Sequence, residues 1–188
     1  MIFNLLKETP SMKEIYLREL SLTDIDTLNE WRNSRETIDC LGANFRYVDI
    51  AIDAKWFENY QQNRMSNVRL AICSKETSQL LGAVYLLNID WLNRNTEFAI
   101  WLGDESCRGQ GIGERATALA LEHAFSDLNL HKVYLTVLET NKAAIGLYNK
   151  VGFKKEGVLV DAVYKNGKYT NMVSMAIIKK VSKRYCVS

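Results

Sequence analysis

The sequence has few of the residues that build metal sites or disulfide frameworks. Its 188 residues include 4 cysteines and 2 histidines. No two cysteines show the Cys-x-x-Cys spacing of a zinc site, and neither His123 nor His131 lies in a cluster of ligand residues. We therefore expect no metal cofactor and no structural zinc.

The sequence also lacks a strong charge imbalance and long apolar runs. The formal net charge is +2, which is too small to favour nucleic acid or an anionic membrane as a partner. No apolar run approaches the ~18 residues of a membrane span, and the first residues show no secretory signal pattern. We therefore expect a cytoplasmic protein that has neither nucleic acid nor membrane as a partner.

Proline occurs once, as Pro10, near the start of the chain. A chain of 188 residues with 47% hydrophobic and 24% charged residues has the size and composition of one globular domain. We expect an N-terminal extension at residues 1–11, one domain at residues 12–180 and a C-terminal tail at residues 181–188. No internal repeat or low-complexity tract is present in the sequence.

The periodicity of the apolar residues predicts alternating strands and helices. Strand patterns occur at residues 13–19, 68–73, 80–88, 96–102, 132–138 and 171–178, with one more strand before the turn at Asn166-Gly167. Helical patterns begin near Thr23, cover residues 53–63 and 112–125, and run from Asn141 to Gly152, whereas residues 33–52 lack clean periodicity. This order predicts a mixed α/β domain with one sheet and helices on both faces.

A glycine-rich segment joins the predicted strand at 96–102 to the predicted helix at 112–125. It reads Arg108-Gly109-Gln110-Gly111-Ile112-Gly113. The glycines allow a tight turn, and the free N–H groups and the dipole of the following helix favour a phosphate. Glu114 and Arg115 stand where a P-loop needs Lys and Ser or Thr, and the glycine spacing is not that of dinucleotide folds. The register therefore disfavours an ATP- or NAD-binding protein.

Two motifs follow one another along the chain. The first, Arg/Gln-x-x-Gly-x-Gly/Ala, is present as Arg108, Gly111 and Gly113. The second, Asn-x-x-Ala-x-x-Leu-Tyr-x-x-x-Gly-Phe, begins at Asn141 and ends at Phe153. Together they resemble the GNAT superfamily of acetyl-CoA-dependent N-acetyltransferases, and the resemblance covers roughly residues 12–180. The shorter words Leu17-Arg18 and Glu30-Trp31-Arg32-Asn33 resemble its RimJ/RimL-type branch.

The resemblance implies a fold and a cosubstrate. The fold is a single mixed α/β domain, with a twisted, mostly antiparallel sheet of about six or seven strands and helices on both faces. The two central strands, at 96–102 and 132–138, would splay apart to admit the pantetheine arm of acetyl-CoA. Backbone groups of Ile100, Trp101 and Leu102 would pair with that arm, and a backbone N–H near Leu102 would polarise the thioester carbonyl.

The resemblance also implies further residues that bind acetyl-CoA. The loop would wrap the pyrophosphate, and Asn141 would cap a helix and touch the cofactor arm. The implied loop residues are Arg108, Gly109, Gln110, Gly111, Ile112 and Gly113.

Two residues are candidates for proton transfer during direct acetyl transfer, without a covalent enzyme intermediate. Tyr148 matches the family tyrosine that donates a proton to the departing sulfur, which a phenol can do without being ionised. Glu97 is the candidate base, acting directly or through a water. The alternatives are a packed aromatic for Tyr148 and, for Glu97, an exposed carboxylate or an ion-pair partner of Arg94.

The acceptor amine stays open at this point. The branch resemblance favours a protein or peptide N-terminal amine, while a polyamine, an amino sugar of a surface-polysaccharide pathway and an aminoglycoside are also compatible. An acidic groove containing Asp49, Asp53 and Glu58 would favour a polyamine or an aminoglycoside. A groove of aromatic residues and arginines would favour a nucleotide-linked amino sugar; the residues considered for the acceptor side are Arg32, Arg46, Tyr47, Trp56 and Tyr85.

Two further questions concern the class of protein and its assembly. A non-catalytic acyl-CoA-binding module is the alternative to an enzyme, and the presence of both Glu97 and Tyr148 argues against it. A homodimer is compatible with the family resemblance, although no heptad or apolar stripe indicates an interface.

Overall fold

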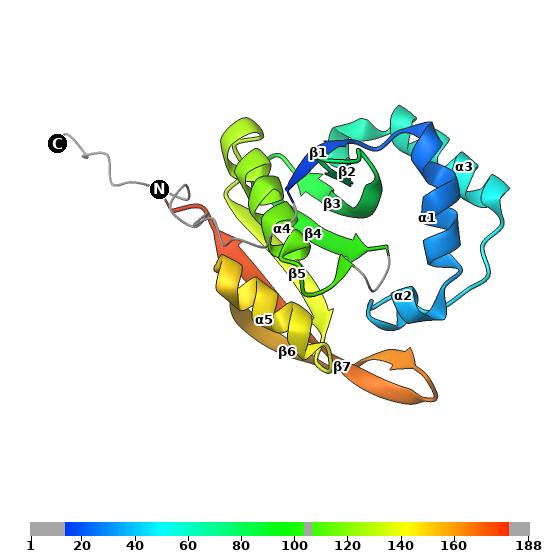
Figure 1. Ribbon diagram of the computed structural model, residues 1–188. Coiled ribbons are helices and arrows are strands. Elements are labelled where there is room, and N and C mark those ends of the chain that lie inside the picture. Colours follow the sequence, from blue (N-terminus) through cyan, green and yellow to red (C-terminus); the bar gives the residue numbers. More distant parts are fainter. Residues whose placement is uncertain (1–13, 104–106, 181–188) are drawn as a thin grey trace.

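The computed structural model describes residues 14–103 and 107–180, so the expected extension at 1–11 and tail at 181–188 lie outside the described residues. A single seven-stranded sheet has the order β1-β2-β3-β4-β5-β7-β6 (Figure 1). Its strands are β1 (Ile15–Glu19), β2 (Val68–Ser74), β3 (Leu80–Asp90), β4 (Asn95–Leu102), β5 (Lys132–Leu138), β6 (Lys154–Lys165) and β7 (Lys168–Ile178). All neighbouring strands are antiparallel except β4 and β5. The predicted fold class is thereby confirmed.

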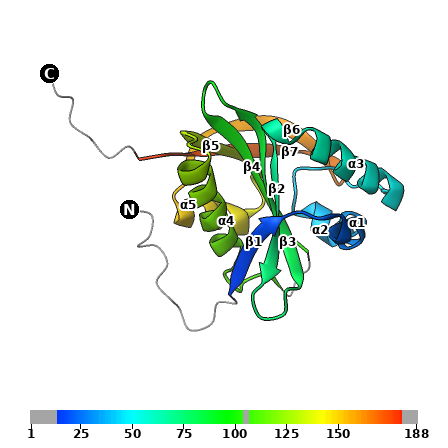
Figure 2. The ribbon, with the colours of Figure 1, turned by 90° about the horizontal axis from the view of Figure 1, so that it is seen from above.

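Helices cover both faces of the sheet, as Figure 2 shows. One face carries α1 (Ile25–Arg32), α2 (Arg35–Asp39) and α3 (Ile50–Gln62), and the other carries α4 (Ile112–Glu122) and α5 (Lys142–Val151). Short helical turns complete the set: η2 (Leu22–Asp24), η3 (Arg64–Ser66) and the π-helical turn η5 (His123–Asp127). No helix within residues 14–103 and 107–180 is long and apolar enough to cross a membrane.

Capping residues explain where the structure differs from the predicted helices. Ser21 and Asp24 form a capping box, so the first helical segment begins at η2, before the predicted Thr23. Helix α2 was not predicted; Ser34 caps it by accepting a hydrogen bond from the Thr37 N–H. Helix α3 begins earlier than the predicted Asp53 because Asp49 caps it, accepting from the Ala51 N–H at 2.8 Å.

The core lies in two layers, one on each side of the sheet. The larger layer packs α4 and α5 against the sheet and includes fully buried Ile112, Phe125 and Phe153. The other layer packs α1 and α3 against the sheet through Leu28 and Phe57. Burying each such side chain contributes about 1.5–3 kcal/mol to the free energy of unfolding, which fixes the helices on their faces.

Strand β4 contributes side chains to both layers by strict alternation. Phe98, Ile100 and Leu102 pack into the α4/α5 layer. Ala99 and Trp101 pack into the α1/α3 layer. Glu97 therefore points to the α1/α3 side of the sheet, because it alternates with Phe98.

Strands β4 and β5 separate after a short paired segment. Their parallel pairing consists of Asn95 with Lys132, Thr96 with Val133, and Glu97 with Tyr134. Both strands continue beyond this point, β4 to Leu102 and β5 to Leu138, without pairing to each other. The predicted splay between the two central strands is therefore present, and it opens toward the loop that follows β4.

Candidate active site

A cleft of about 1310 Å³ follows the splay and continues onto the α1/α3 face. At the loop end, the cleft is lined by residues 107–114 together with Ile100 and Leu102 of β4. At the opposite end, which we call the arginine end, it is lined by Arg32, Trp56, Arg69 and Tyr85. Glu97 and Tyr148 also line it. The structure thus brings all the predicted catalytic and cofactor-binding residues to one cleft.

Backbone geometry shapes the loop end. Gly109 and Gly111 have φ values of +72° and +76°, and Gly111 is the N-cap residue of α4. Only glycine adopts these values without strain, so the turn aims the first N–H groups of α4 at the cleft. Gly113 has another role: a Cβ there would lie 2.9 Å from Leu147 Cδ1, so glycine permits the close packing of α4 on α5. Ile112 is fully buried in the core.

The free edge of β4 presents backbone groups to the gap. The Gly103 N–H donates to the Leu81 carbonyl at 2.9 Å, so at Gly103 the backbone faces β3. Alternate residues of a strand face opposite edges, so the backbone of Trp101 also faces β3, whereas that of Ile100 and Leu102 faces the gap. Trp101 instead lines the cleft from the α1/α3 side, where its ring packs edge-on against Trp31 at 5.9 Å.

Tyr148 lies on α5 beside the point where the strands separate. Its ring packs against Phe98 and Phe153, with centroids 6.3 Å and 5.6 Å away, and the residue is 7% exposed. Burial raises the pKa of the Tyr148 phenol to about 12. Within residues 14–103 and 107–180, no hydrogen bond engages its hydroxyl. The phenol therefore stays protonated at neutral pH and has a proton to donate.

Glu97 is the last β4 residue that pairs with β5, and it lies half-buried on the other face of the sheet. Asn88 Nδ2 donates to its carboxylate at 3.3 Å. Arg94, the alternative partner considered from the sequence, instead donates to the carbonyl and the side-chain oxygen of Asn129, both at 2.8 Å. Glu97 thus has no ion-pair partner in the part of the chain that the structure describes. Burial and the Glu97 charge both raise the pKa of Tyr134 opposite it.

Asn141 ties helix α5 to the residues that border the cleft. Its Oδ1 accepts from the Ala144 N–H at 3.0 Å, which confirms the predicted cap, and its Nδ2 donates to the Cys40 carbonyl at 3.0 Å. Lys165, at the end of β6, donates to the carbonyls of Ile38, Leu41 and Ala43. Residues 40–44, which line the cleft, are therefore held from two elements. The predicted contact of Asn141 with the cofactor arm stays a prediction.

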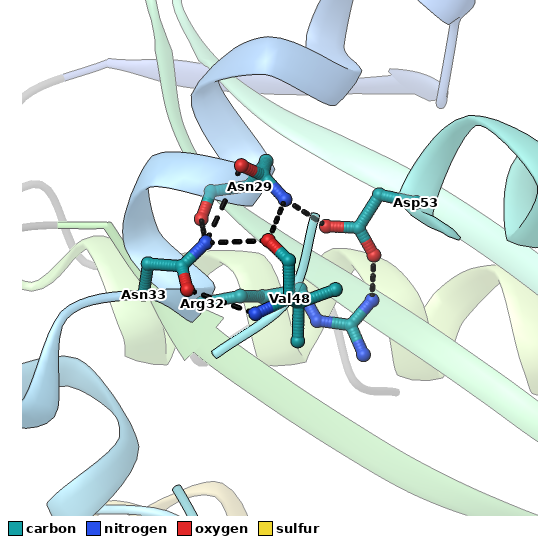
Figure 3. Close-up of polar contacts among 5 residues, drawn as sticks. All are labelled: Asn29, Arg32, Asn33, Val48 and Asp53. Atoms are coloured by element: carbon teal, nitrogen blue, oxygen red, sulfur yellow. Dashed lines mark hydrogen bonds and ion pairs between the residues drawn. The ribbon is translucent and has the colours of Figure 1, made fainter. Parts of the chain in front are cut away.

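The arginine end contains the ion pair of Arg32 with Asp53 and the guanidinium of Arg69, which has no ion-pair partner among the described residues. Asp53 is buried; it accepts from Arg32 and, at 2.8 Å, from Asn29 Nδ2. Figure 3 shows these contacts together with those of Asn33 and Asn29 to Val48. The carboxylate of Asp53 is thus neutralised by Arg32, so the acidic groove considered from the sequence does not form there.

The other residues considered for the acceptor side divide into two groups. Arg32, Arg46, Trp56 and Tyr85 line the cleft, whereas Tyr47 is 82% exposed and lies outside it. Asp49 is occupied as the cap of α3, and Glu58 is absent from the lining. Sequence reasoning missed Arg69 and Lys165. A charged residue inside the apolar run of β2 was the one available signal for Arg69.

Comparisons with known proteins agree with this geometry. Residues 14–154 match the family model of the acetyltransferase (GNAT) domain. The chain therefore belongs to the GNAT acetyltransferase family, as the two motifs predicted. Among the described residues, no group of three or more His, Cys, Asp or Glu side chains could hold a metal ion.

Individual relatives extend the comparison. The chain is 40% identical over 98 residues to spermidine N(1)-acetyltransferase of Escherichia coli K12, and this match spans about half, 52%, of each chain. It is 27% identical to the probable N-acetyltransferase YjcK of Bacillus subtilis, over 88% of this chain and 94% of the relative. A crystal structure of spermidine N-acetyltransferase from Vibrio cholerae with CoA and spermine superposes with a TM-score of 0.81 at 27% identity, covering 87% of this chain and 95% of that one.

Proposed function

We propose that this protein is an acetyl-CoA-dependent N-acetyltransferase that transfers acetyl directly to the primary amine of a small molecule. The observation that carries the proposal is the position of Tyr148 and Glu97. Glu97 is the last paired residue of β4 and lies on one face, and Tyr148 packs on the neighbouring Phe98 from the other. A thioester in the gap would thus have a proton donor on one side and a carboxylate on the other.

Acetyl-CoA would be held mainly by backbone groups. The first N–H groups of α4 would bind the pyrophosphate at the helix N-terminus. The pantetheine arm would pair with Ile100 and Leu102 as an added strand, and an N–H of this edge would stabilise the oxyanion. Binding energy from these distant contacts would position the thioester for attack.

The chemical step would then need only proton transfers around one displacement. The neutral amine attacks the thioester carbonyl carbon, forming a C–N bond and an oxyanion, and the C–S bond breaks as the carbonyl reforms. Tyr148 gives its proton to the departing sulfur, and the proton of the new ammonium passes to Glu97, directly or through water. No covalent enzyme intermediate is required.

The nature of the acceptor is the finer part of the proposal. The preference for a protein amine depended on the RimJ/RimL-type resemblance, which stays a prediction, as do a cytoplasmic location and a homodimer. The spermidine acetyltransferases among the relatives instead support a small amine. A polyamine is therefore a specific second candidate, and the charge of the arginine end bears directly on it.

A thiol-release assay tests the proposed function. The enzyme is incubated with acetyl-CoA and, separately, an N-terminal peptide, spermidine, an aminoglycoside and amino sugars, with acceptor-free controls. We expect acceptor-dependent release of CoA with at least one small amine and an acetylated product by mass spectrometry. Tight acetyl-CoA binding with no release for any amine would instead support the non-catalytic binding module.

A further inference from the structure

We infer that the arginine end of the cleft is an anion subsite in which Arg69, backed by Arg32, binds a phosphate or carboxylate carried by the acceptor amine. This inference rests on the proposed function and narrows its substrate class. It points away from a polyamine and toward an amine that carries negative charge, such as a phosphorylated or nucleotide-linked amino sugar.

Arg69 belongs to a row of residues that leads across the sheet to the gap. It pairs with Tyr85 of β3, and Tyr85 pairs with Ala99 of β4, so these three side chains share the α1/α3 face. Glu97 lies one alternation away on the same face of β4. Ala99 is small, so an acceptor can lie over it with its amine near Glu97. Its other end would reach Arg69 about two strand spacings away, ~10 Å.

The guanidinium of Arg69 is held by aromatic rings and not by a carboxylate. Its Cζ lies 4.7 Å from the ring centroids of Trp56 and Tyr85 and 5.5 Å from that of Tyr60. Its Nε is buried and has no hydrogen-bond partner, and it forms no ion pair within the described residues. Burial lowers the pKa of Arg69, and the charge of Arg32 lowers it further, yet an arginine stays protonated.

The charges of this end leave a positive excess. Arg32 is neutralised by Asp53, whose other carboxylate oxygen accepts from Asn29. Arg69 then contributes one uncompensated positive charge, and Arg46 lines the same cleft. A half-buried guanidinium without a counter-ion is costly unless a ligand supplies the counter-charge. Its planar fork suits phosphate and carboxylate oxygens.

The aromatic residues add a second recognition element. Trp56 lies close to two guanidiniums, with Arg32 Cζ 5.7 Å and Arg69 Cζ 4.7 Å from its ring centroid. A polyamine would bring several positive charges into this arrangement and would be repelled by the uncompensated charge of Arg69. A sugar phosphate or a nucleotide would place its anion on the fork and its flat or apolar faces on the rings.

The test compares amines that differ in one anionic group. Glucosamine, glucosamine 6-phosphate and UDP-glucosamine carry the same amine, and spermidine and an amino acid serve as cationic and carboxylate probes. We expect kcat/KM to be about tenfold or more higher for a phosphate-bearing probe than for glucosamine, with spermidine poorest. The two phosphate probes distinguish a sugar phosphate from a nucleotide-linked sugar, and the amino acid reports a carboxylate.

Variants assign the effect to Arg69. Arg69→Gln is expected to lower the ratio of kcat/KM for the anionic probe to kcat/KM for glucosamine about tenfold or more, mainly through the KM of the anionic probe. Arg69→Lys retains the charge without the planar guanidinium fork, so its preference for the anionic probe should lie between those of wild type and Arg69→Gln. Arg64→Gln, at an arginine that is 58% exposed and outside the cleft, is the matched control. Thermal melting of each variant checks that it is folded.

The outcomes separate this inference from the proposed function. Release with glucosamine or spermidine, but with no preference for anionic probes, overturns the subsite and leaves the acetyltransferase intact. If no amine supports release, calorimetric titration of UDP-glucosamine and glucosamine 6-phosphate into the CoA-bound protein still tests the subsite. Binding of either probe that is lost in Arg69→Gln supports the subsite even then, and absence of binding overturns it.

Discussion

The two ends of the cleft are formed by different kinds of groups, backbone at one end and side chains at the other. The loop end uses backbone N–H groups, supplied by one continuous segment and the free edge of β4, and glycines at positive φ give it its shape. The arginine end uses side chains from α1, α3, β2 and β3, and its properties depend on which charges cancel. On the proposed function, the backbone end would bind acetyl-CoA, whereas the side-chain end would determine which acceptor is bound.

Substitutions test this difference between the two ends. Changes at the loop end should affect every acceptor equally, and changes at the arginine end should alter the choice among acceptors. Changes where the two ends meet should lower the rate of the chemical step itself.

The largest effect is expected where the two ends meet. Tyr148→Phe removes the phenolic proton but keeps the ring packing against Phe98 and Phe153. We expect kcat to fall about 10²-fold or more for every acceptor, with CoA affinity unchanged, because general acid catalysis is lost. Steady-state kinetics and calorimetry measure both. Tyr164→Phe, at an exposed tyrosine outside the cleft, is the control, and wild-type kcat in Tyr148→Phe would refute the assignment.

A smaller effect, limited to the binding of acetyl-CoA, is expected at the loop end. Gly111→Ala places a Cβ at φ +76°, which costs about 1–2 kcal/mol and tilts the N-terminus of α4. We expect the KM for acetyl-CoA to rise about tenfold whichever acceptor is used. Gly157→Ala, where an added Cβ meets nothing within 4 Å, is the matched control. An effect that depended on the acceptor would contradict the separation of the two ends.

Asn141 has two roles, one in stability and one in acceptor binding, which two substitutions can separate. Asn141→Ala removes the cap of α5, so we expect the free energy of unfolding to fall by about 1 kcal/mol. It also releases the Cys40 carbonyl and thus residues 40–44, which should raise the acceptor KM. Asn141→Ser keeps a capping oxygen but not the amide donor, so it should restore stability without restoring KM. Chemical denaturation and kinetics on the same samples measure the two effects.

The smallest effect on activity is expected from an ion pair outside the cleft. Arg18 donates to Asp24 through two hydrogen bonds of 2.7 Å. Burial alone would raise the pKa of Asp24, but the hydrogen bonds from Arg18 and Ser21 outweigh it and hold the pKa below 3.8. The stabilisation is therefore present at neutral pH and is lost as the pH falls through the folded-state pKa.

Asp24→Asn should accordingly destabilise the protein by about 1–2 kcal/mol at neutral pH. The difference from wild type should shrink below pH 3.8, the ordinary value of the carboxyl. Denaturant melts across pH measure it, with acetyl transfer at neutral pH as the second readout. A change in acceptor preference would show that this pair acts on the cleft, contrary to the expectation that it affects stability alone.

The same division explains what could be predicted from the sequence. The strands of the sheet and the turn at the loop end follow local patterns, since alternation and glycine spacing act within a few residues. The splay was expected from the family resemblance alone. Helix α2 and the start of α3 were missed because single caps, Ser34 and Asp49, decide them. The arginine end could not be predicted, since the pairing of Asp53 with Arg32 arises only when α1 and α3 pack together.

The alternation of β4 has a consequence for how this protein can vary. Glu97, Ala99 and Trp101 face the acceptor side, while Phe98, Ile100 and Leu102 belong to the core. Removing or inserting a single residue would exchange the two sets and place core side chains in the cleft. Acceptor preference in this fold should therefore drift by replacement at every second position of β2, β3 and β4, with strand lengths preserved. A mutant library built on that spacing would sample new acceptors while sparing the core.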